Sequence, residues 1–254
     1  MRHAVQHETV RRVFVFSVSV RIFHWINAIA ITLLIATGLI MANPPAIQQG
    51  HEASFGFWFG TVRFIHFATA YIFTAAFVYR IYLMFAGNQY ERWRNFVPTS
   101  WQYFKEIGEV IRFDVLLKKN AKHFALGHNA LAGFSYLVIF IFMLIMVLTG
   151  FALYSNMSTA WFPHLFTWVT SLLGGDIMVR IVHHVSMWVF ILFIIIHVYL
   201  VFYHDYVEGR GETSSIVGGW KFCNEDLLEE HLKHENDMLT SKKKKSAKKP
   251  AHAG

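Results

Sequence analysis

Four long apolar runs constrain this chain more than any other feature of its sequence. Each run is 23 to 25 residues long, so as an α-helix it would measure about 35 Å. That length crosses a hydrocarbon core of about 30 Å with some tilt. The runs are continuous rather than alternating, which favours helices over a β-barrel. They cover residues 20–42, 62–86, 130–154 and 181–203.

The composition agrees with a protein that spans a membrane. Hydrophobic residues make up 55% of the 254 positions and charged residues only 15%, whereas a soluble domain carries about 25% charged residues. We therefore predict an all-α membrane protein, a four-transmembrane-helix bundle over residues 20–205. A cytoplasmic N-terminal segment (1–19) precedes the bundle, and a basic cytoplasmic tail (206–254), expected to be largely disordered, follows it.

Two further segments are predicted to be helical and to lie at the membrane surface. The stretch from Trp161 to Leu173 is apolar, but it is too short to span and it contains Pro163. Between the second and third runs, Trp101, Phe104 and Ile111 repeat at helical spacing. That pattern is typical of an amphipathic interfacial helix, and it fits equally well a short helix that caps the bundle.

Lysine and arginine alternate between the segments that connect the runs. Residues 43–60 and 155–179 contain none, whereas both flanking segments and the middle loop contain several. Under the positive-inside rule, both termini and the middle loop are cytoplasmic, as in a multi-pass protein of a bacterial inner membrane. The net charge of +7 is therefore a topology signal. It predicts contact with membrane lipid and no nucleic-acid partner.

The apolar runs contain histidines, which are costly there and usually functional. Under the predicted orientation, His24 and His197 lie toward the cytoplasm, and His66 and His183 lie toward the periplasm. His183 and His197 are 14 residues apart, so they share a helix face and lie about 21 Å apart along its axis. His184 is turned away from that face, and we expect it to point elsewhere.

Two levels, each with histidines from two helices, predict two non-covalent b haems with bis-histidine ligation. The expected axial pairs are His24 with His197 and His66 with His183. Two axial imidazoles fill the coordination sphere of a haem iron, which suits electron transfer. The single cysteine, Cys223, excludes an internal disulfide, a cysteine-ligated iron–sulfur cluster and covalent C-x-x-C-H haem attachment.

An arginine precedes three of these histidines by three residues, which places each pair on one helix face. Because haem propionates are anions that need paired cations, we predict these arginines to contact them. Their other reading is that they only mark the ends of the spans. They are Arg21, Arg63 and Arg180, and Arg80 is a further candidate at the cytoplasmic level.

The stretches RIFHWINAIAITLLIATG (Arg21 to Gly38) and RIVHHVSMWVFILFIIIH (Arg180 to His197) resemble the b-type cytochrome subunit of membrane-bound nickel–iron hydrogenases. GHNALAG (127–133) and TGFALYS (149–155) extend the resemblance over nearly the whole chain. It implies a subunit that anchors the small and large subunits of a periplasmic hydrogenase. Electrons from H2 would pass through two haems to menaquinone or ubiquinone.

The resemblance also implies where the quinone binds and how the chain is classified. Asn129 matches the quinone position and could hydrogen-bond a quinone carbonyl. His128 lies beside it in sequence, where it could act as a proton relay. Both also suit a polar cap at a helix start. The chain would be the electron-transfer subunit of a H2:quinone oxidoreductase complex, with quinone reduced at this subunit and no further catalytic residue.

Three alternatives remain open from sequence alone. The cytochrome subunit of a formate dehydrogenase or thiosulfate reductase would have the same haems and a different partner. A histidine-lined metal-ion transporter would favour acidic residues within the spans, but the four runs contain no Asp or Glu. A purely structural anchor does not explain histidines paired at two depths.

Overall fold

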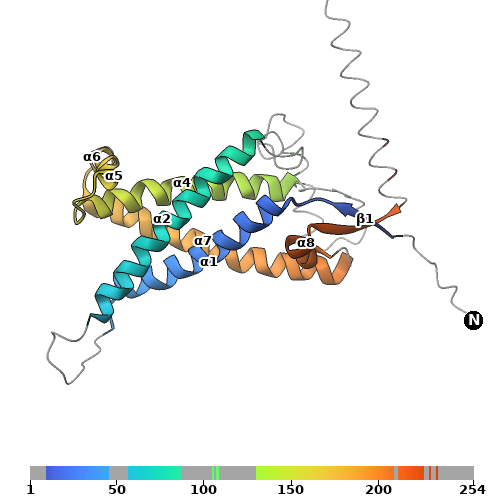
Figure 1. Ribbon diagram of the computed structural model, residues 1–254, viewed down its shortest axis with the longest axis horizontal. Helices are drawn as coiled ribbons and strands as arrows, with labels where there is room; N and C mark the ends of the chain where they lie inside the picture. The colour runs from blue at the N-terminus through green and yellow to red at the C-terminus, as the bar shows by residue number, and fades with distance from the viewer. Residues whose placement is uncertain are drawn as a thin grey trace, which may run out of the picture.

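The computed structural model describes residues 10–45, 57–86, 105, 107–108, 130–208, 211–225, 229 and 233. Four long helices dominate it, and all four are long and apolar enough to cross a membrane. They lie side by side along the longest axis of the molecule (Figure 1), which confirms the predicted four-helix bundle. Their bounds are Val18–Ala42 (α1), Trp58–Ala86 (α2), Ala130–Ser155 (α4) and Asp176–Glu208 (α7).

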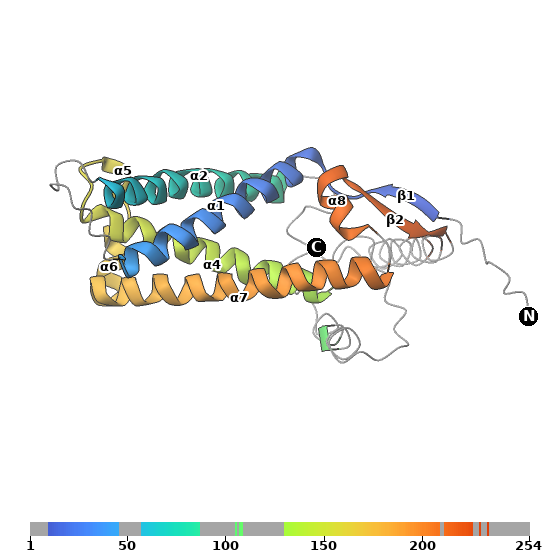
Figure 2. The ribbon, with the colours of Figure 1, turned by 90° about the horizontal axis from the view of Figure 1, so that it is seen from below.

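The bundle consists of two helix pairs that enclose a shared apolar core. Helix α1 packs mainly along α2, and α4 packs mainly along α7. Figure 2 shows the four helices from the side, with α1 and α2 adjacent and α7 beside α4. The core between the pairs is rich in phenylalanine and draws on all four helices. It contains Phe23, Ala30, Phe73, Ala76, Phe77, Met143, Val147, Phe151 and Phe190.

Two short helices close one end of the bundle, between α4 and α7 (Figure 1). They are α5 (Trp161–His164) and α6 (Thr167–Leu173), and they occupy the stretch predicted to be interfacial. Val169 of α6 is buried against Ala152 and Val179, which fixes the segment on the bundle. The other predicted surface helix, around residues 101–111, falls almost wholly outside the described residues.

At the opposite end, the segments that flank the bundle fold together. Strand β1 (Val10–Phe14) pairs antiparallel with β2 (Trp220–Asn224), and the short helix α8 (Glu212–Gly218) precedes β2. We call β1, α8 and β2 the clamp. Because β1 precedes α1 and β2 follows α7, their pairing holds both flanking segments at the same end of the bundle.

The clamp was not predicted from the sequence, in which residues 206–254 were expected to form a largely disordered tail. The reason is that its contacts join segments about two hundred residues apart. The backbone N–H of Val15 donates to the Gly219 carbonyl at 2.9 Å, and the Arg21 guanidinium donates to the Val217 carbonyl. The Lys221 side chain is buried over the Phe16 ring, with its nitrogen 5.7 Å from the ring centroid.

Replacing Gly219 with alanine is expected to loosen the clamp. Gly219 has φ +87°, and an added Cβ would lie 2.8 Å from the Phe16 carbonyl oxygen. The left-handed conformation alone costs a non-glycine residue about 1–2 kcal/mol. Hydrogen exchange of the β2 amides should accelerate accordingly. Gly218→Ala is the matched control because its Cβ would meet nothing within 4 Å; equal exchange in the two variants would contradict the prediction.

Candidate functional site

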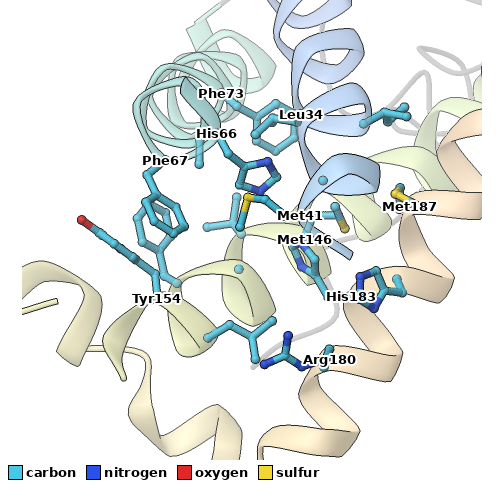
Figure 3. Close-up of a pocket in the computed structure, with 18 of the residues that line it drawn as sticks. Leu34, Met41, His66, Phe67, Phe73, Met146, Tyr154, Arg180, His183 and Met187 are labelled. Atoms are coloured by element: carbon cyan, nitrogen blue, oxygen red, sulfur yellow. The ribbon is translucent and has the colours of Figure 1, made fainter. Parts of the chain in front are cut away.

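Two of the predicted histidines face one cavity of about 370 Å³ near the α5–α6 end of the bundle. His66 comes from α2 and His183 from α7, and residues from α1 and α4 complete the wall. Figure 3 shows His66 and His183 on different sides of this space, with Arg180 below them. We call His66 and His183 the outer pair, after their predicted periplasmic position.

A threonine contacts each histidine of the outer pair from the neighbouring helix. Thr37 Oγ1 on α1 lies 2.8 Å from Nδ1 of His66. Thr149 Oγ1 on α4 lies 2.9 Å from Nδ1 of His183. The two helix pairs of the bundle therefore repeat the same arrangement, in which one helix supplies the imidazole and its partner supplies the hydroxyl.

A glycine follows each of these threonines, and the absence of a side chain there leaves room for the imidazoles. A Cβ on Gly38 would lie 3.4 Å from Cε1 of His66, and one on Gly150 would lie 3.2 Å from Cε1 of His183. Both glycines also line the cavity. Any larger side chain at these positions would enter space that the histidines border.

The second predicted pair lies toward the clamp end, and we call it the inner pair. The ring centroids of His24 on α1 and His197 on α7 are 6.4 Å apart, with the rings inclined by 49°. An imidazole nitrogen lies about 2 Å from a bound first-row metal ion such as zinc. Two imidazoles that bind one ion from opposite sides therefore have ring centroids about 6 Å apart. The spacing of His24 and His197 suits two ligands of one metal ion.

The three arginines predicted to meet propionates lie in different surroundings. Arg180 is exposed and lines the outer cavity one helical turn from His183. Arg63 places a guanidinium nitrogen 2.9 Å from Sδ of Met157, a cavity residue. Arg21 donates to the Val217 carbonyl in the clamp. Arg180 is thus the arginine that the fold brings to the cavity itself.

The arginine named as a further candidate, Arg80, is buried among aromatic rings. Its Nε donates to the hydroxyl of Tyr136, which joins α2 to α4. Its guanidinium carbon lies 5.8 Å from the ring centroid of Phe23, the neighbour of His24 in sequence. These contacts place the Arg80 guanidinium between Phe23 of α1 and Tyr136 of α4.

His184 lies differently from the sequence expectation, and the predicted quinone residues fall outside the described part of the chain. His184, which we expected to point away, lines the outer cavity beside His183, because a wide cavity admits side chains from adjacent positions of one helix. His128 and Asn129, the predicted quinone residues, lie outside the described residues. Within the described part of the chain, no group of three or more His, Cys, Asp and Glu side chains could hold a metal ion.

The threonines and glycines of the outer cavity were not among the site residues predicted from the sequence. A signal was available, because the dipeptide Thr-Gly occurs twice in the chain, at residues 37–38 and 149–150. The first lies near the end of the first apolar run and the second in the third run. Under the predicted topology both lie at the level of His66 and His183.

Comparison with known families decides what kind of protein has this site. The family model for prokaryotic cytochrome b561 matches residues 15–219, which include the bundle and α8. The chain belongs to this cytochrome b561 family. It is therefore a b-type cytochrome, a membrane protein that carries haem b and transfers electrons, as the resemblance in sequence implied.

Relatives of this cytochrome b561 protein cover most of its length. A probable Ni/Fe-hydrogenase B-type cytochrome subunit of Cupriavidus necator is 35% identical over 84% of this chain and 88% of its own. The protein of the same name from Azotobacter vinelandii is 34% identical over 86% and 93%. A probable Ni/Fe-hydrogenase 1 B-type cytochrome subunit of Escherichia coli is 32% identical over 82% and 90%.

The residues of the two histidine pairs fit the haem b of a cytochrome b561 protein. Because a porphyrin supplies four nitrogen ligands, the two imidazoles of one pair would complete the coordination of one haem iron. The inner pair has the spacing of two imidazoles with a shared ion. The outer pair faces a cavity at whose wall Gly38 and Gly150 keep the space clear of side chains.

Proposed function

We propose that this cytochrome b561 protein is the membrane electron-transfer subunit of a H2:quinone oxidoreductase. It anchors a periplasmic nickel–iron hydrogenase and carries electrons from H2 oxidation to menaquinone or ubiquinone. The observation that supports this most is the pairing of histidines at two levels of the bundle, His66 with His183 and His24 with His197. The names of the relatives supply the hydrogenase partner.

Each level is proposed to hold one haem b with two axial histidines. Haem b, when bound, supplies a one-electron carrier. His66 and His183 fix the outer position, and His24 and His197 fix the inner one about 21 Å further along α7. The phenylalanine-rich core draws buried residues from all four helices, and we propose that it keeps water out of the space between the two levels. Arg180 supplies positive charge for propionates at the outer cavity, and we propose the same role for Arg63 and for Arg21.

The orientation follows from the distribution of Lys and Arg. We propose that the α5–α6 end faces the periplasm of a bacterial inner membrane, where the small and large hydrogenase subunits bind. The clamp and both termini then lie in the cytoplasm. The segment 1–19, the bundle 20–205 and the tail 206–254 remain the proposed divisions of the chain, with the clamp formed from the first and last of them.

Quinone reduction is proposed to occur near the inner pair, where protons come from the cytoplasm. Asn129 is proposed to donate a hydrogen bond to a quinone carbonyl, and His128 to relay a proton. The role of Asn129 follows from the resemblance to hydrogenase cytochromes, in which it matches the quinone position, and that of His128 from its place beside Asn129 in sequence.

The test uses membranes that contain the full chain and its hydrogenase partner. Addition of H2 is expected to reduce the b haems and then a soluble quinone analogue, whereas formate should reduce neither. Membranes that lack only this chain should keep H2-dependent dye reduction and lose quinone reduction. Haem reduction by formate and not by H2 would instead assign the chain to a formate dehydrogenase.

A further inference from the structure

Thr37 and Thr149 contact Nδ1 of the outer histidines through a hydroxyl oxygen. The hydrogen of each hydroxyl is donated to a backbone carbonyl of the threonine's own helix. Thr37 Oγ1 donates to the Leu33 carbonyl at 2.6 Å, and Thr149 Oγ1 donates to the Ile145 carbonyl at 2.7 Å. A hydroxyl has one hydrogen to donate and two lone pairs to accept with. Toward the imidazoles, each threonine therefore acts as an acceptor.

An acceptor at Nδ1 decides where the imidazole carries its hydrogen. A neutral imidazole donates from one nitrogen and accepts at the other. Because Oγ1 accepts at 2.8 and 2.9 Å, Nδ1 of His66 and of His183 is the protonated nitrogen. Nε2 then keeps its lone pair and is free to bind a metal ion.

We infer that Thr37 and Thr149 are positioning residues that hold His66 and His183 as Nε2 ligands of the outer haem iron. The inference rests on the proposed ligation by the outer pair. A partner on the second nitrogen of a ligating histidine fixes its tautomer and ring orientation and raises its basicity. Greater basicity favours the oxidised iron, so the two threonines lower the midpoint potential of the outer haem.

The inner pair provides an internal comparison. Nδ1 of His24 is buried and has no hydrogen-bond partner among the described residues. Among the described residues no hydrogen bond joins a threonine to His24 or His197, so hydrogen bonding by threonine distinguishes the outer level from the inner one. Removing the hydroxyls should change the outer haem and leave the inner haem as it was.

The variants Thr37→Val and Thr149→Val remove the hydroxyl and keep the branched shape. Thr32→Val is the matched control, because Thr32 is exposed on α1 and its Oγ1 donates to the Ala28 carbonyl at 2.7 Å. It loses the same type of carbonyl hydrogen bond without touching a histidine. Thr37→Ser and Thr149→Ser restore a hydroxyl and serve as rescue variants.

The full chain in membranes is titrated optically, and its ferric haems are examined by low-temperature electron paramagnetic resonance. The outer haem is identified as the component lost in His66→Ala. The valine variants are expected to raise the midpoint potential of that component and shift its low-spin signal, with the inner component unchanged. The serine variants and Thr32→Val should match the wild type.

Loss of the outer haem in the valine variants, with retention in the serine variants, would equally support the inference. Unchanged potential and signal in the valine variants would overturn it while leaving the ligation intact. Equal haem loss in valine and serine variants would also overturn it, because the hydroxyl would then not matter. If His66→Ala keeps both haems, the proposed ligation fails, and this inference fails with it.

Discussion

His66→Ala is expected to abolish the outer haem and to retain the inner one. Haem content per protein should fall by about half, since one of the two proposed bis-histidine sites would lose an axial ligand. His183→Ala should give the same result, because His66 and His183 border one cavity from different helices. The measurement is a dithionite-reduced minus oxidised spectrum with haem quantitation on the purified full chain.

His184→Ala is the control that makes this result specific. His184 lines the same cavity and adjoins His183 in sequence, but the contact with Thr149 belongs to His183. The variant should keep both haems. If His184→Ala lost the outer haem and His183→Ala kept it, the pairing of His66 with His183 would be incorrect. A wild-type protein without haem would contradict ligation at both levels.

His197→Ala is expected to remove the inner haem and to separate haem reduction from quinone reduction. H2 should still reduce the outer haem, since His66 and His183 lie about 21 Å away along the bundle. Loss of even an outer-shell partner of a metal ligand costs about 10–100-fold, so loss of the ligand itself should slow H2-dependent quinone reduction at least that much. Stopped-flow spectra and quinone reduction rates on the same membranes give both quantities.

Val198→Ala serves as the control for this variant, because Val198 is an exposed neighbour of His197 on α7. It should keep both haems and the wild-type rate. Quinone reduction at the wild-type rate in His197→Ala would place the quinone upstream of the inner level. Loss of both haems would show that the substitution disrupts the bundle, and His24→Ala would then need to remove the inner haem alone to support the pairing.

Much of this protein follows from local properties of its sequence. The four spans depend only on runs of apolar residues, and helix geometry alone puts His183 and His197 on one face at two depths. A position within a span fixes its depth in a bundle of helices that run alongside one another. For this reason the division of His24, His66, His183 and His197 into two levels needs no knowledge of helix packing.

The tertiary structure decided what surrounds each histidine. The contacts of Thr37 with His66 and of Thr149 with His183 join different helices, so they depend on which helices pack together and with what rotation. The same dependence brought His184 to the cavity wall against expectation. Adjacent positions on a helix differ by about 100°, and only packing determines how wide an arc faces the interior.

The clamp depends most on tertiary structure. A five-residue strand such as β2 (Trp220–Asn224) has no stability of its own, because its hydrogen bonds are satisfied only by pairing. Its partner β1 (Val10–Phe14) lies beyond the whole bundle in sequence. The sequence by itself therefore determined the helices, which satisfy their backbone hydrogen bonds internally. Only the assembled bundle, which brings the two flanking segments to one end, decided that they form a sheet.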